Sequence, residues 1–380
     1  MFDYQKNHRY FAQTPESIKA SAESELASLG AEKISPGFRG IYFSADAATL
    51  YRINYKARLI TRVLAPLVSF ECRDRNALYE AGRSIDWNTL FSADQTFGVI
   101  SNVSQNDNLK NSHFAALCVK DSVVDHFRTR TGKRPNVDKD APDVWINLYV
   151  DKTHGVINLD TSGGSLHRRG YRKQSVEAPM QEITAAALVA MSGWNGDKPL
   201  YDPMCGSGTI LCEALMAYCK IPSGFLKTRF GFFHLPDFKE SLWKRVKTEA
   251  DREIRDLPPD LIEGSDSSSE AVKAGRENSS LLPGGKMIKI SKKGFAEIPT
   301  LENRTILCNP PYGIRMKTEG NLGDFYKAFG DFLKQRCKGS EAYVFFGNRE
   351  MLKHIGLKTE WKEPVEIAGL DGRIAKYVLY

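Results

Sequence analysis

Apolar and polar residues alternate with two different periods along the second half of the chain. Short apolar runs that end in polar or glycine-containing turns predict strands at residues 198–203, 260–266, 285–290, 304–310 and 342–348. Between these runs, for example in residues 209–220 and 324–338, apolar residues recur every three or four positions and predict helices. Regular alternation of strands and helices predicts a parallel sheet with helices on both faces.

Two further apolar runs close the chain, at residues 363–370 and 373–380. Asp371 and Gly372 lie between them, and an Asp-Gly pair is a strong hairpin signal. We therefore expect the last two strands to be antiparallel, with Asp371 and Gly372 in the turn.

The N-terminal part of the chain follows a less regular pattern. Residues 9–14 and 39–45 predict strands around an intervening helix, and residues 144–150 and 155–161 predict two strands joined by a turn. We expect a mixed α+β region here. A glycine- and arginine-rich segment, residues 162–178, joins it to the second half.

Composition narrows the class of protein without identifying it. The chain has 380 residues, of which 42% are hydrophobic and 26% charged, and it has no apolar run long enough for a bilayer span. Seven scattered cysteines without a CxxC pair argue against a disulfide framework or a zinc site, so no metal is expected. No signal-peptide pattern is present, and we expect a cytoplasmic protein. The formal charge of +7 suits a polyanionic partner, or an ordinary basic surface.

One loop has the features of a small-molecule site. The strand ending at Asp202 runs into Pro-Met-Cys-Gly-Ser-Gly-Thr, in which Gly206 and Gly208 permit a tight turn and the close approach of a ligand. A dinucleotide site would have a third glycine, whereas an acid at the strand end suits a ligand with a cationic end. S-adenosyl-L-methionine has such an end, and Asp266, after the next strand, would bind its ribose. Asp266 follows Gly208 by 58 residues, so we expect an extended crossover with a basic, aromatic-containing surface between them.

A second motif follows the apolar run before Asn309. In Asn309-Pro310-Pro311-Tyr312 the two prolines fix the backbone and remove two competing N–H donors. The Asn309 side-chain oxygen and the Pro310 carbonyl are then free to accept hydrogen bonds from an exocyclic amine of a base. Such acceptors would localise the lone pair of the nitrogen, and Tyr312 would stack on the base.

Together these residues resemble the THUMP-domain class I RNA methyltransferases, and specifically the bacterial branch that forms N2-methylguanine in large-subunit ribosomal RNA. The similarity covers nearly the whole chain, and its specific segments are DTSGGSLHRRGYRK, YDPMCGSGTILCEA and LCNPPYGIRM. It implies an α/β fold in which a Rossmann-like class I methyltransferase domain follows an α+β ferredoxin-like and THUMP RNA-binding region. The implied parts are residues 1–55 (ferredoxin-like), 56–161 (THUMP), 162–178 (basic linker) and 179–380 (catalytic domain).

The resemblance also implies roles for individual residues, with S-adenosyl-L-methionine as cofactor. The donor would be held by Asp202, Pro203, Cys205, Gly206, Ser207, Gly208, Thr209, Asp266, Phe295 and Asn309. The target base would be held by Asn309, Pro310, Pro311 and Tyr312. Two positions depart from the family pattern: Ser268 replaces a second acid after the ribose acid, and Gly294 replaces the acid that usually precedes the residue flanking the adenine. With one methyltransferase domain, one reaction is expected.

The linker is the first candidate for RNA contact. Arg168, Arg169, Arg172 and Lys173 surround Tyr171, and cations neutralise phosphates while an aromatic ring stacks on an unpaired base. The crossover offers a second candidate surface, at Lys227, Arg229, Lys239, Lys244, Arg245 and Lys247. A guanine in a duplex must leave its stack before its N2 is reached, so base flipping is expected.

Three functions remain open from the sequence. The first is a monomeric ribosomal RNA guanine-N2 methyltransferase without membrane contact. The second is another enzyme with the same acceptor motif, acting on guanine N2 in tRNA, adenine N6 in DNA, or glutamine in a protein. The third is an RNA-binding ribosome assembly factor with a vestigial methyltransferase domain.

Overall fold

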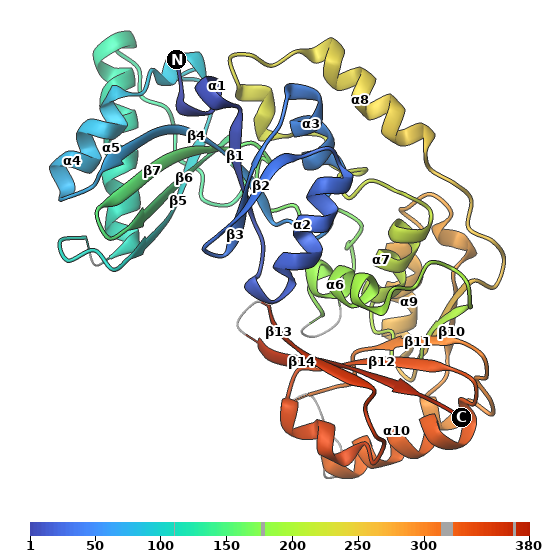
Figure 1. The fold of residues 1–380 in the computed structure, drawn as a ribbon. Helices are drawn as coiled ribbons and strands as arrows, with labels where there is room; N and C mark the ends of the chain where they lie inside the picture. Colours follow the sequence, from blue (N-terminus) through green and yellow to red (C-terminus); the bar gives the residue numbers. More distant parts are fainter. Residues whose placement is uncertain (110, 176–178, 313–321, 368–369) are drawn as a thin grey trace. The chain divides into compact units, whose positions relative to one another are not determined.

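The computed structural model describes residues 1–109, 111–175, 179–312, 322–367 and 370–380. They form two compact units, each built on one seven-stranded sheet (Figure 1). Unit 1 comprises Met1–Thr14, Glu23–Leu166 and Lys227–Thr248. Unit 2 comprises Pro15–Ala22, His167–Leu226 and Glu249–Tyr380. Each unit is built from segments that are far apart in the sequence. The four parts predicted from the sequence are continuous ranges and do not include this exchange of segments.

Unit 1 contains a mixed sheet with the strand order β2-β3-β1-β4-β7-β6-β5. The strands are β1 (Arg9–Gln13), β2 (Glu32–Gly37), β3 (Gly40–Ser44), β4 (Arg62–Glu71), β5 (Phe97–Ser104), β6 (Val144–Asp151) and β7 (His154–Asp160). Neighbouring strands are antiparallel except β5 and β6, which are parallel. The four strands expected in this region from the sequence are confirmed as β1, β3, β6 and β7.

Of the helices in the N-terminal region, α3, α4 and α5 begin at side-chain caps. They are α1 (Asp3–Asn7), α2 (Lys19–Ser28), α3 (Ala47–Lys56), α4 (Arg75–Ser84) and α5 (Ser112–Thr131). Asp46, Asp74 and Asn111 each accept a hydrogen bond from the backbone N–H three residues on, at the starts of α3, α4 and α5. Their buried faces include Leu50, Leu78 and other apolar side chains that form the core of unit 1.

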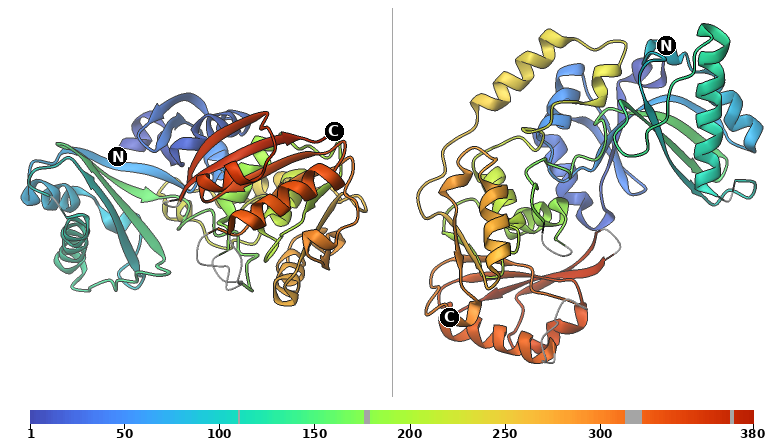
Figure 2. Two further views of the ribbon diagram at one scale, coloured as in Figure 1. Left: turned by 90° about the horizontal axis from the view of Figure 1, so that it is seen from below. Right: turned by 180° about the vertical axis from the view of Figure 1, so that it is seen from behind.

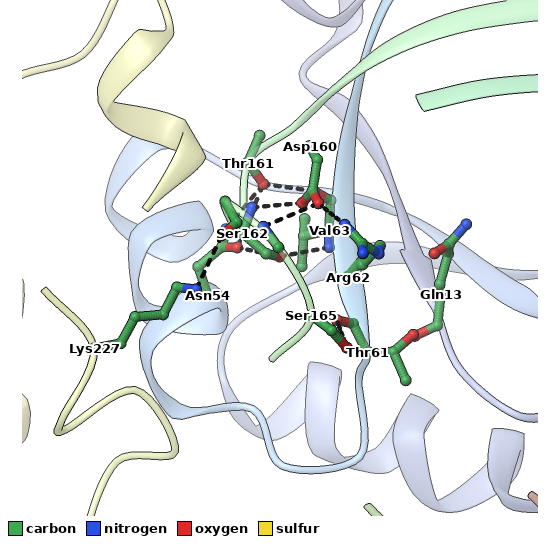
Figure 3. A network of polar contacts seen from close by, with 12 residues as sticks. Gln13, Asn54, Thr61, Arg62, Val63, Asp160, Thr161, Ser162, Ser165 and Lys227 are labelled. Atoms are coloured by element: carbon green, nitrogen blue, oxygen red, sulfur yellow. Dashed lines mark hydrogen bonds and ion pairs between the residues drawn. The ribbon is translucent and has the colours of Figure 1, made fainter. Parts of the chain in front are cut away.

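The chain leaves unit 1 through a buried polar network at the end of β7 (Figure 3). Asp160 accepts hydrogen bonds from the N–H groups of Ser162 (2.9 Å) and Gly164 (3.2 Å) and forms an ion pair with Arg62. Burial raises the pKa of Asp160, although the Arg62 guanidinium opposes that effect. Asn54 of α3 accepts from the Ser162 hydroxyl at 2.9 Å. These contacts fix the backbone direction at the point where the predicted linker begins.

The crossover between the two acids belongs to unit 1 in its middle part, Lys227–Thr248. It contains a 3₁₀ turn, η3 (Gly231–His234), and α8 (Glu240–Arg252). Phe232 stacks on Tyr51 of α3 with ring centroids 4.5 Å apart, and Trp243 lies edge-on to Tyr55 at 5.3 Å. We call Lys227–Thr248 the strap. Its aromatic side chains are packed into unit 1 and do not form the exposed aromatic surface expected from the sequence.

Unit 2 contains the predicted parallel sheet, with the strand order β10-β9-β8-β11-β12-β14-β13. The strands are β8 (Leu200–Asp202), β9 (Ile262–Asp266), β10 (Lys289–Lys292), β11 (Thr305–Cys308), β12 (Glu341–Phe346), β13 (Trp361–Ile367) and β14 (Leu370–Val378). Helices α6 (Glu182–Ser192), α7 (Thr209–Tyr218) and α9 (Ser269–Ser279) lie on one side and α10 (Leu322–Arg336) on the other (Figures 1 and 2). This confirms the expected Rossmann-like α/β class.

The closing hairpin differs from the sequence expectation in one detail. β13 and β14 are antiparallel, as predicted. Asp371 and Gly372, however, pair with Glu366 and Val365 inside the ladder and belong to β14. The prediction that Asp371 and Gly372 form the turn is therefore wrong, because both are held by strand pairing.

Candidate active site

The strand order of unit 2 places the two predicted motifs next to each other. Going from β10 through β9 to β8 the sequence runs backwards, and from β8 to β11 and β12 it runs forwards. Ligands in open α/β sheets bind at such a reversal, beside the carboxyl ends of the strands. Asp202 ends β8, Asp266 ends β9, and Asn309 directly follows β11. The three side chains therefore meet at one edge of the sheet.

The loop after β8 is tied to its neighbours by short hydrogen bonds. The Asp266 carboxylate accepts from the N–H of Gly206 at 2.9 Å and from the N–H of Ser268 at 2.9 Å. Gly206 (φ 53°) and Gly208 (φ 81°) both lie in the left-handed region that favours glycine. A Cβ at Gly208 would also lie only 3.2 Å from the backbone of Gly275 in α9. The loop thus requires glycine for its backbone angles and for its close packing against α9.

Asp202 is the buried acid of the site. Its side chain is 1% exposed and accepts a hydrogen bond from the N–H of Met204 at 3.0 Å. Burial raises the pKa of Asp202 well above its usual range, and the nearby Asp266 carboxylate raises it further. A cationic group bound beside Asp202 would stabilise its ionised form.

A single cavity of about 390 Å³ contains most of the predicted donor residues. Of these, it is lined by Asp202, Pro203, Cys205, Gly206, Ser207, Thr209, Asp266, Phe295 and Asn309. It is also lined by Pro311, by Gly294 and by residues that the sequence did not suggest, namely Pro179, Met180, Met204, Ile210, Ser267, Ala296 and Phe325. Gly208, Pro310 and Tyr312 are not part of the lining. The volume suits a small-molecule ligand.

Asn309 carries the most unusual atom of this cavity. Its Oδ1 is buried and has no hydrogen-bond partner among the described residues. An unsatisfied buried acceptor costs about 1–3 kcal/mol, so a ligand donor at this position would be favoured. The following Pro310 and Pro311 have no N–H that could satisfy this oxygen locally.

The rest of the acceptor motif is held by α10 and the end of β12. Tyr326 of α10 donates a hydrogen bond to the Pro311 carbonyl at 3.1 Å. The Tyr312 ring lies edge-on to Phe345 with centroids 6.5 Å apart. A Cβ on Gly347 would come within 2.5 Å of that ring, so Gly347 leaves the space that Tyr312 occupies.

An exposed acid, Glu297, directly follows the part of the cavity lining that Gly294, Phe295 and Ala296 form. Glu297 accepts a hydrogen bond from the Gly294 N–H at 2.6 Å, and its oxygen lies 3.5 Å from where a Cβ on Gly294 would stand. Phe295, between them, lies edge-on to Phe325 at 5.4 Å. An acid three residues after the N-cap of a turn is the sequence signal of a capping box, and it points to Glu297.

Asn278 is a second residue that sequence reasoning missed. From α9, its amide nitrogen donates to the Ser207 carbonyl at 3.1 Å, and its oxygen accepts from the N–H groups of Lys173 and Gln174. Asn278 therefore connects the donor loop with the linker. No pattern in the sequence marks it, because its partners lie more than sixty residues away.

The linker residues predicted to contact RNA separate into two groups. Arg168 and Lys173 are exposed. The Arg169 side chain is fully buried with its Nε 3.3 Å from Glu213 of α7, and the buried Tyr171 hydroxyl donates to the same carboxylate at 3.0 Å. Arg169 and Tyr171 have no surface for RNA, so we assign them to the packing of the linker against α7.

Arg172 also has intramolecular partners. It pairs with Glu182 at 3.1 Å and donates to the Met180 carbonyl at 2.7 Å and the Thr209 hydroxyl at 3.2 Å. Met180 and Thr209 both line the cavity. Arg172 therefore supports the wall of the site. The last linker residues, 176–178, lie outside the described part of the chain.

The cations of the strap are partly engaged as well. Lys227 donates to the Gly163 carbonyl at 3.1 Å, Arg229 pairs with Asp143 at 3.1 Å, and Lys244 pairs with Glu240 at 2.7 Å. Lys247 lies over the Tyr55 ring at 5.3 Å. These contacts favour a structural role for much of the second predicted RNA surface.

The described residues contain neither a membrane-spanning helix nor a cluster of metal ligands. No helix in those ranges is long and apolar enough to cross a membrane. Within the same ranges, no group of three or more His, Cys, Asp or Glu side chains is placed to hold a metal ion.

Comparisons with known families agree with the resemblance seen in the sequence. The RMKL-like methyltransferase domain matches residues 169–375, the THUMP domain residues 72–160, and the RlmL ferredoxin-like domain residues 9–64. These matches confirm the expected order of ferredoxin-like, THUMP and methyltransferase regions. The residue boundaries predicted from the sequence stay predictions.

Relatives are similar to this chain along nearly all of its length. A protein of Synechocystis sp. provisionally named an RNA methyltransferase is 42% identical over 98% of this chain and 97% of its own length. The ribosomal RNA large subunit methyltransferase K/L of Photobacterium profundum is 32% identical over 98% of this chain. The chain spans only 53% of that relative's length.

Solved structures share the fold. A provisionally assigned methyltransferase crystallised with S-adenosylhomocysteine has a TM-score of 0.84, 25% identity and 98% coverage of both chains. A Listeria monocytogenes protein described as a predicted N6-adenine-specific DNA methylase has a TM-score of 0.83 and 25% identity, with 99% of this chain and 97% of that chain covered. TrmN of Thermus thermophilus, with a TM-score of 0.69 and 17% identity over 97% of this chain and 98% of its own, shows the fold alone.

Proposed function

The chain belongs to the RMKL-like methyltransferase family, uses S-adenosyl-L-methionine as methyl donor, and, we propose, methylates N2 of a guanine in large-subunit ribosomal RNA. RNA as the substrate class is supported by the THUMP region and by the relatives named as RNA methyltransferases. Ribosomal RNA as the substrate is supported by the name of relatives that match 93–98% of this chain, which are ribosomal RNA large subunit methyltransferases.

The observation that carries the proposal is the unsatisfied oxygen of Asn309. It accepts one N–H of the target amine, while the Pro310 carbonyl accepts the other. An amine on a purine ring is a weak nucleophile because its lone pair is delocalised into the ring. Two fixed acceptors favour a pyramidal nitrogen, localise that pair and direct it toward the methyl group. Catalysis then depends on positioning and on preorganised dipoles more than on a strong base.

Tyr312 holds the base that the acceptors grip. Its ring is kept in place by Phe345 and by the space above Gly347. A flipped guanine stacks on one face of this ring, which places N2 at Asn309. Tyr326 fixes the backbone between the two residues through its hydrogen bond to the Pro311 carbonyl.

The donor cavity fits the proposed cofactor in its charges. S-adenosyl-L-methionine supplies an electrophilic methyl group on a sulfonium ion. Asp202 faces its ammonium group, the start of α7 faces its carboxylate, and Asp266 accepts from its ribose hydroxyls. Glu297 accepts from the 6-amino group of its adenine, in place of the acid missing at Gly294.

The test is single-turnover methyl transfer to undermodified large-subunit rRNA with saturating donor, followed by nucleoside mass spectrometry. We expect N2-methylguanosine as the product. Asn309→Ala should slow the step by about 10²–10³-fold, because one preorganised acceptor is removed. Asn309→Asp is the matched control, since it keeps an acceptor at the same position and should lose less. Donor affinity should change little in either variant.

Other outcomes would distinguish the alternatives. Near-parental rates for a folded Asn309→Ala variant contradict the proposed role of the motif. Methylation of tRNA guanine, DNA adenine or a protein glutamine would retain the chemistry and replace the substrate. RNA binding without any methyl transfer would favour the assembly factor with a vestigial catalytic domain.

A further inference from the structure

A second hollow lies in unit 1, on the less buried face of its sheet. Along β1, Tyr10 and Ala12 point into the core, whereas Arg9, Phe11 and Gln13 are exposed or half-buried. The hollow has a volume of about 250 Å³, and its lining comes from α1 and from strands β1, β3, β4, β6 and β7. It lies in a different unit from the donor cavity, and the proposed chemistry does not use it.

Aromatic rings form the floor of this hollow. Phe11 of β1 and Tyr42 of β3 are register partners, and their ring centroids are 4.8 Å apart. Tyr149 of β6 lines the same hollow, as does Phe38, which is 62% exposed at the turn between β2 and β3. Rings on neighbouring strands of an open sheet face make a platform on which successive unpaired bases stack.

Positive charge lies at the edge of the same floor. The Arg9 guanidinium lies 5.0 Å from the centroid of the Tyr42 ring. Lys6 of α1 is 58% exposed and forms an ion pair with Asp3 at 2.8 Å. Both cations line the hollow and are oriented by contacts within the unit. This combination of rings and cations is complementary to nucleotides, which carry a stacking base and a phosphate.

Two side-chain amides also line the hollow. Asn147 of β6 and Asn158 of β7 are register partners that line the hollow. The Asn158 amide nitrogen donates to the Asn147 carbonyl at 3.3 Å. Amide groups can donate and accept at the edges of bases, so they add hydrogen bonding to a site otherwise based on stacking.

We propose that this hollow binds unpaired nucleotides of RNA, with bases stacked on Phe11 and Tyr42 and phosphates beside Arg9 and Lys6. The occupant is single-stranded RNA, because aromatic rings with cations at their edge match both parts of a nucleotide. A purely apolar partner would cover the rings but would bring no anion to Arg9, whose contacts are with the Tyr42 ring and the Ser35 hydroxyl. The inference rests on the proposed function only in that RNA is the substrate class.

The experiment measures binding of the full chain to a fluorescein-labelled, unstructured RNA of about eight nucleotides by anisotropy. The Phe11→Leu, Tyr42→Leu double variant keeps apolar bulk in the floor and removes both π-faces. We expect its affinity for this RNA to fall about ten-fold or more. Affinity for an RNA duplex should not change, because paired bases cannot stack on the floor.

Phe114→Leu is the matched control. Phe114 is another exposed phenylalanine of unit 1, on α5, and the Arg75 guanidinium lies 5.6 Å from its ring centroid, as Arg9 lies over Tyr42. This variant should bind the single strand as the parent does. Thermal unfolding and donor affinity establish that each variant is folded. A folded double variant with parental affinity for the single strand overturns the inference, and so does an equal loss in Phe114→Leu.

Failure of this inference can be told from failure of the proposed function. N2-methylguanosine in rRNA together with an unaffected double variant would retain the function and reject the hollow as an RNA site. Loss of single-strand binding in the double variant, with another product or none, would support the hollow and reject the guanine assignment. Arg9→Gln gives a second readout, since it should reduce the salt dependence of binding.

Discussion

Asp202 is a residue whose charge should depend on the presence of the donor. Its pKa is raised by burial and by the Asp266 carboxylate in the structure without ligand. The ammonium group of the donor would lower that pKa in the complex, so binding should release a proton. Between the two pKa values, donor affinity should therefore rise with pH, by up to about ten-fold per pH unit.

Calorimetric titration in buffers with different ionisation enthalpies measures this proton release. Asp202→Asn should bind the donor more weakly and should lose the pH dependence. Parental binding without any proton release would place the ammonium group of the donor elsewhere.

Glu297 offers a separate prediction about the other end of the donor. S-adenosylhomocysteine should bind more tightly than its analogue with a carbonyl oxygen in place of the 6-amino group. A hydrogen bond to a charged group is worth about 1.5–3 kcal/mol, so the preference should be roughly ten-fold or more. Glu297→Ala should remove most of that preference, whereas Glu302→Ala, at another exposed acid, should keep it.

A capping role alone for Glu297 would give a different result. In that case Glu297→Ala would weaken both ligands by the same factor and leave the preference intact. Gly294→Asp in the Glu297→Ala background should restore the preference, because a Cβ at Gly294 meets no atom closer than 3.5 Å.

The sequence could predict the residues that follow strands and could not predict those that reach the site from elsewhere. The sequence could place Asp202, Asp266 and Asn309 next to each other because the carboxyl ends of parallel strands meet at one edge of the sheet. Glu297 and Asn278 act through backbone contacts to Gly294 and Ser207 that depend on how the turn and α9 pack. No spacing pattern in the sequence marks Asn278, and the capping-box spacing that marks Glu297 indicates a turn and not a ligand site.

At the scale of elements, the linker packs against α7 through the buried side chains of Arg169 and Tyr171, in addition to its predicted role in RNA binding. Arg169→Ala would leave the Glu213 carboxylate buried without its ion-pair partner, and breaking a buried pair costs about 3–5 kcal/mol. Denaturant unfolding should show this loss. Arg168→Ala, at the exposed neighbour, should leave the free energy of unfolding nearly unchanged.

The exposed cations of the linker should still contribute to RNA affinity. In Arg168→Ala, Lys173→Ala the slope of log affinity against log salt should become shallower by roughly one to two, because fewer counterions are released. Donor affinity should not change. An identical salt slope in parent and variant would exclude phosphate contact at these two positions.

The alternating pattern predicted the order of strands and helices in unit 2, since each buries an apolar face at a regular period. It placed one strand too early, because residues 285–287 of the strand expected at 285–290 form a 3₁₀ turn and β10 begins at Lys289. The linker was misjudged for Arg169 and Tyr171 because their burial depends on Glu213, which is 44 residues from Arg169 in the sequence. The strap was misjudged for the same reason: its aromatic residues pack on α3, which is almost two hundred residues earlier.

At the scale of the whole molecule, the strap makes unit 1 dependent on the catalytic half of the sequence. A fragment of residues 1–166 would lack Phe232 and Trp243 and would expose the rings of Tyr51 and Tyr55. We expect this fragment to unfold at a lower temperature than the same fragment fused to residues 227–248. Equal melting temperatures for the two proteins would show that the strap adds no stability.

The interleaving of the units also bears on how such a chain can be inherited. The backbone passes from one unit to the other at residues 14/15, 22/23, 166/167, 226/227 and 248/249. A single genetic crossover that falls between α3 and the strap would therefore join the α3 rings of one parent to the strap of the other. Substitutions at Tyr51 and Phe232 must remain compatible for unit 1 to close. We therefore expect the N-terminal and catalytic regions to be inherited together. Recombinant genes that combine these regions from different lineages should be rare.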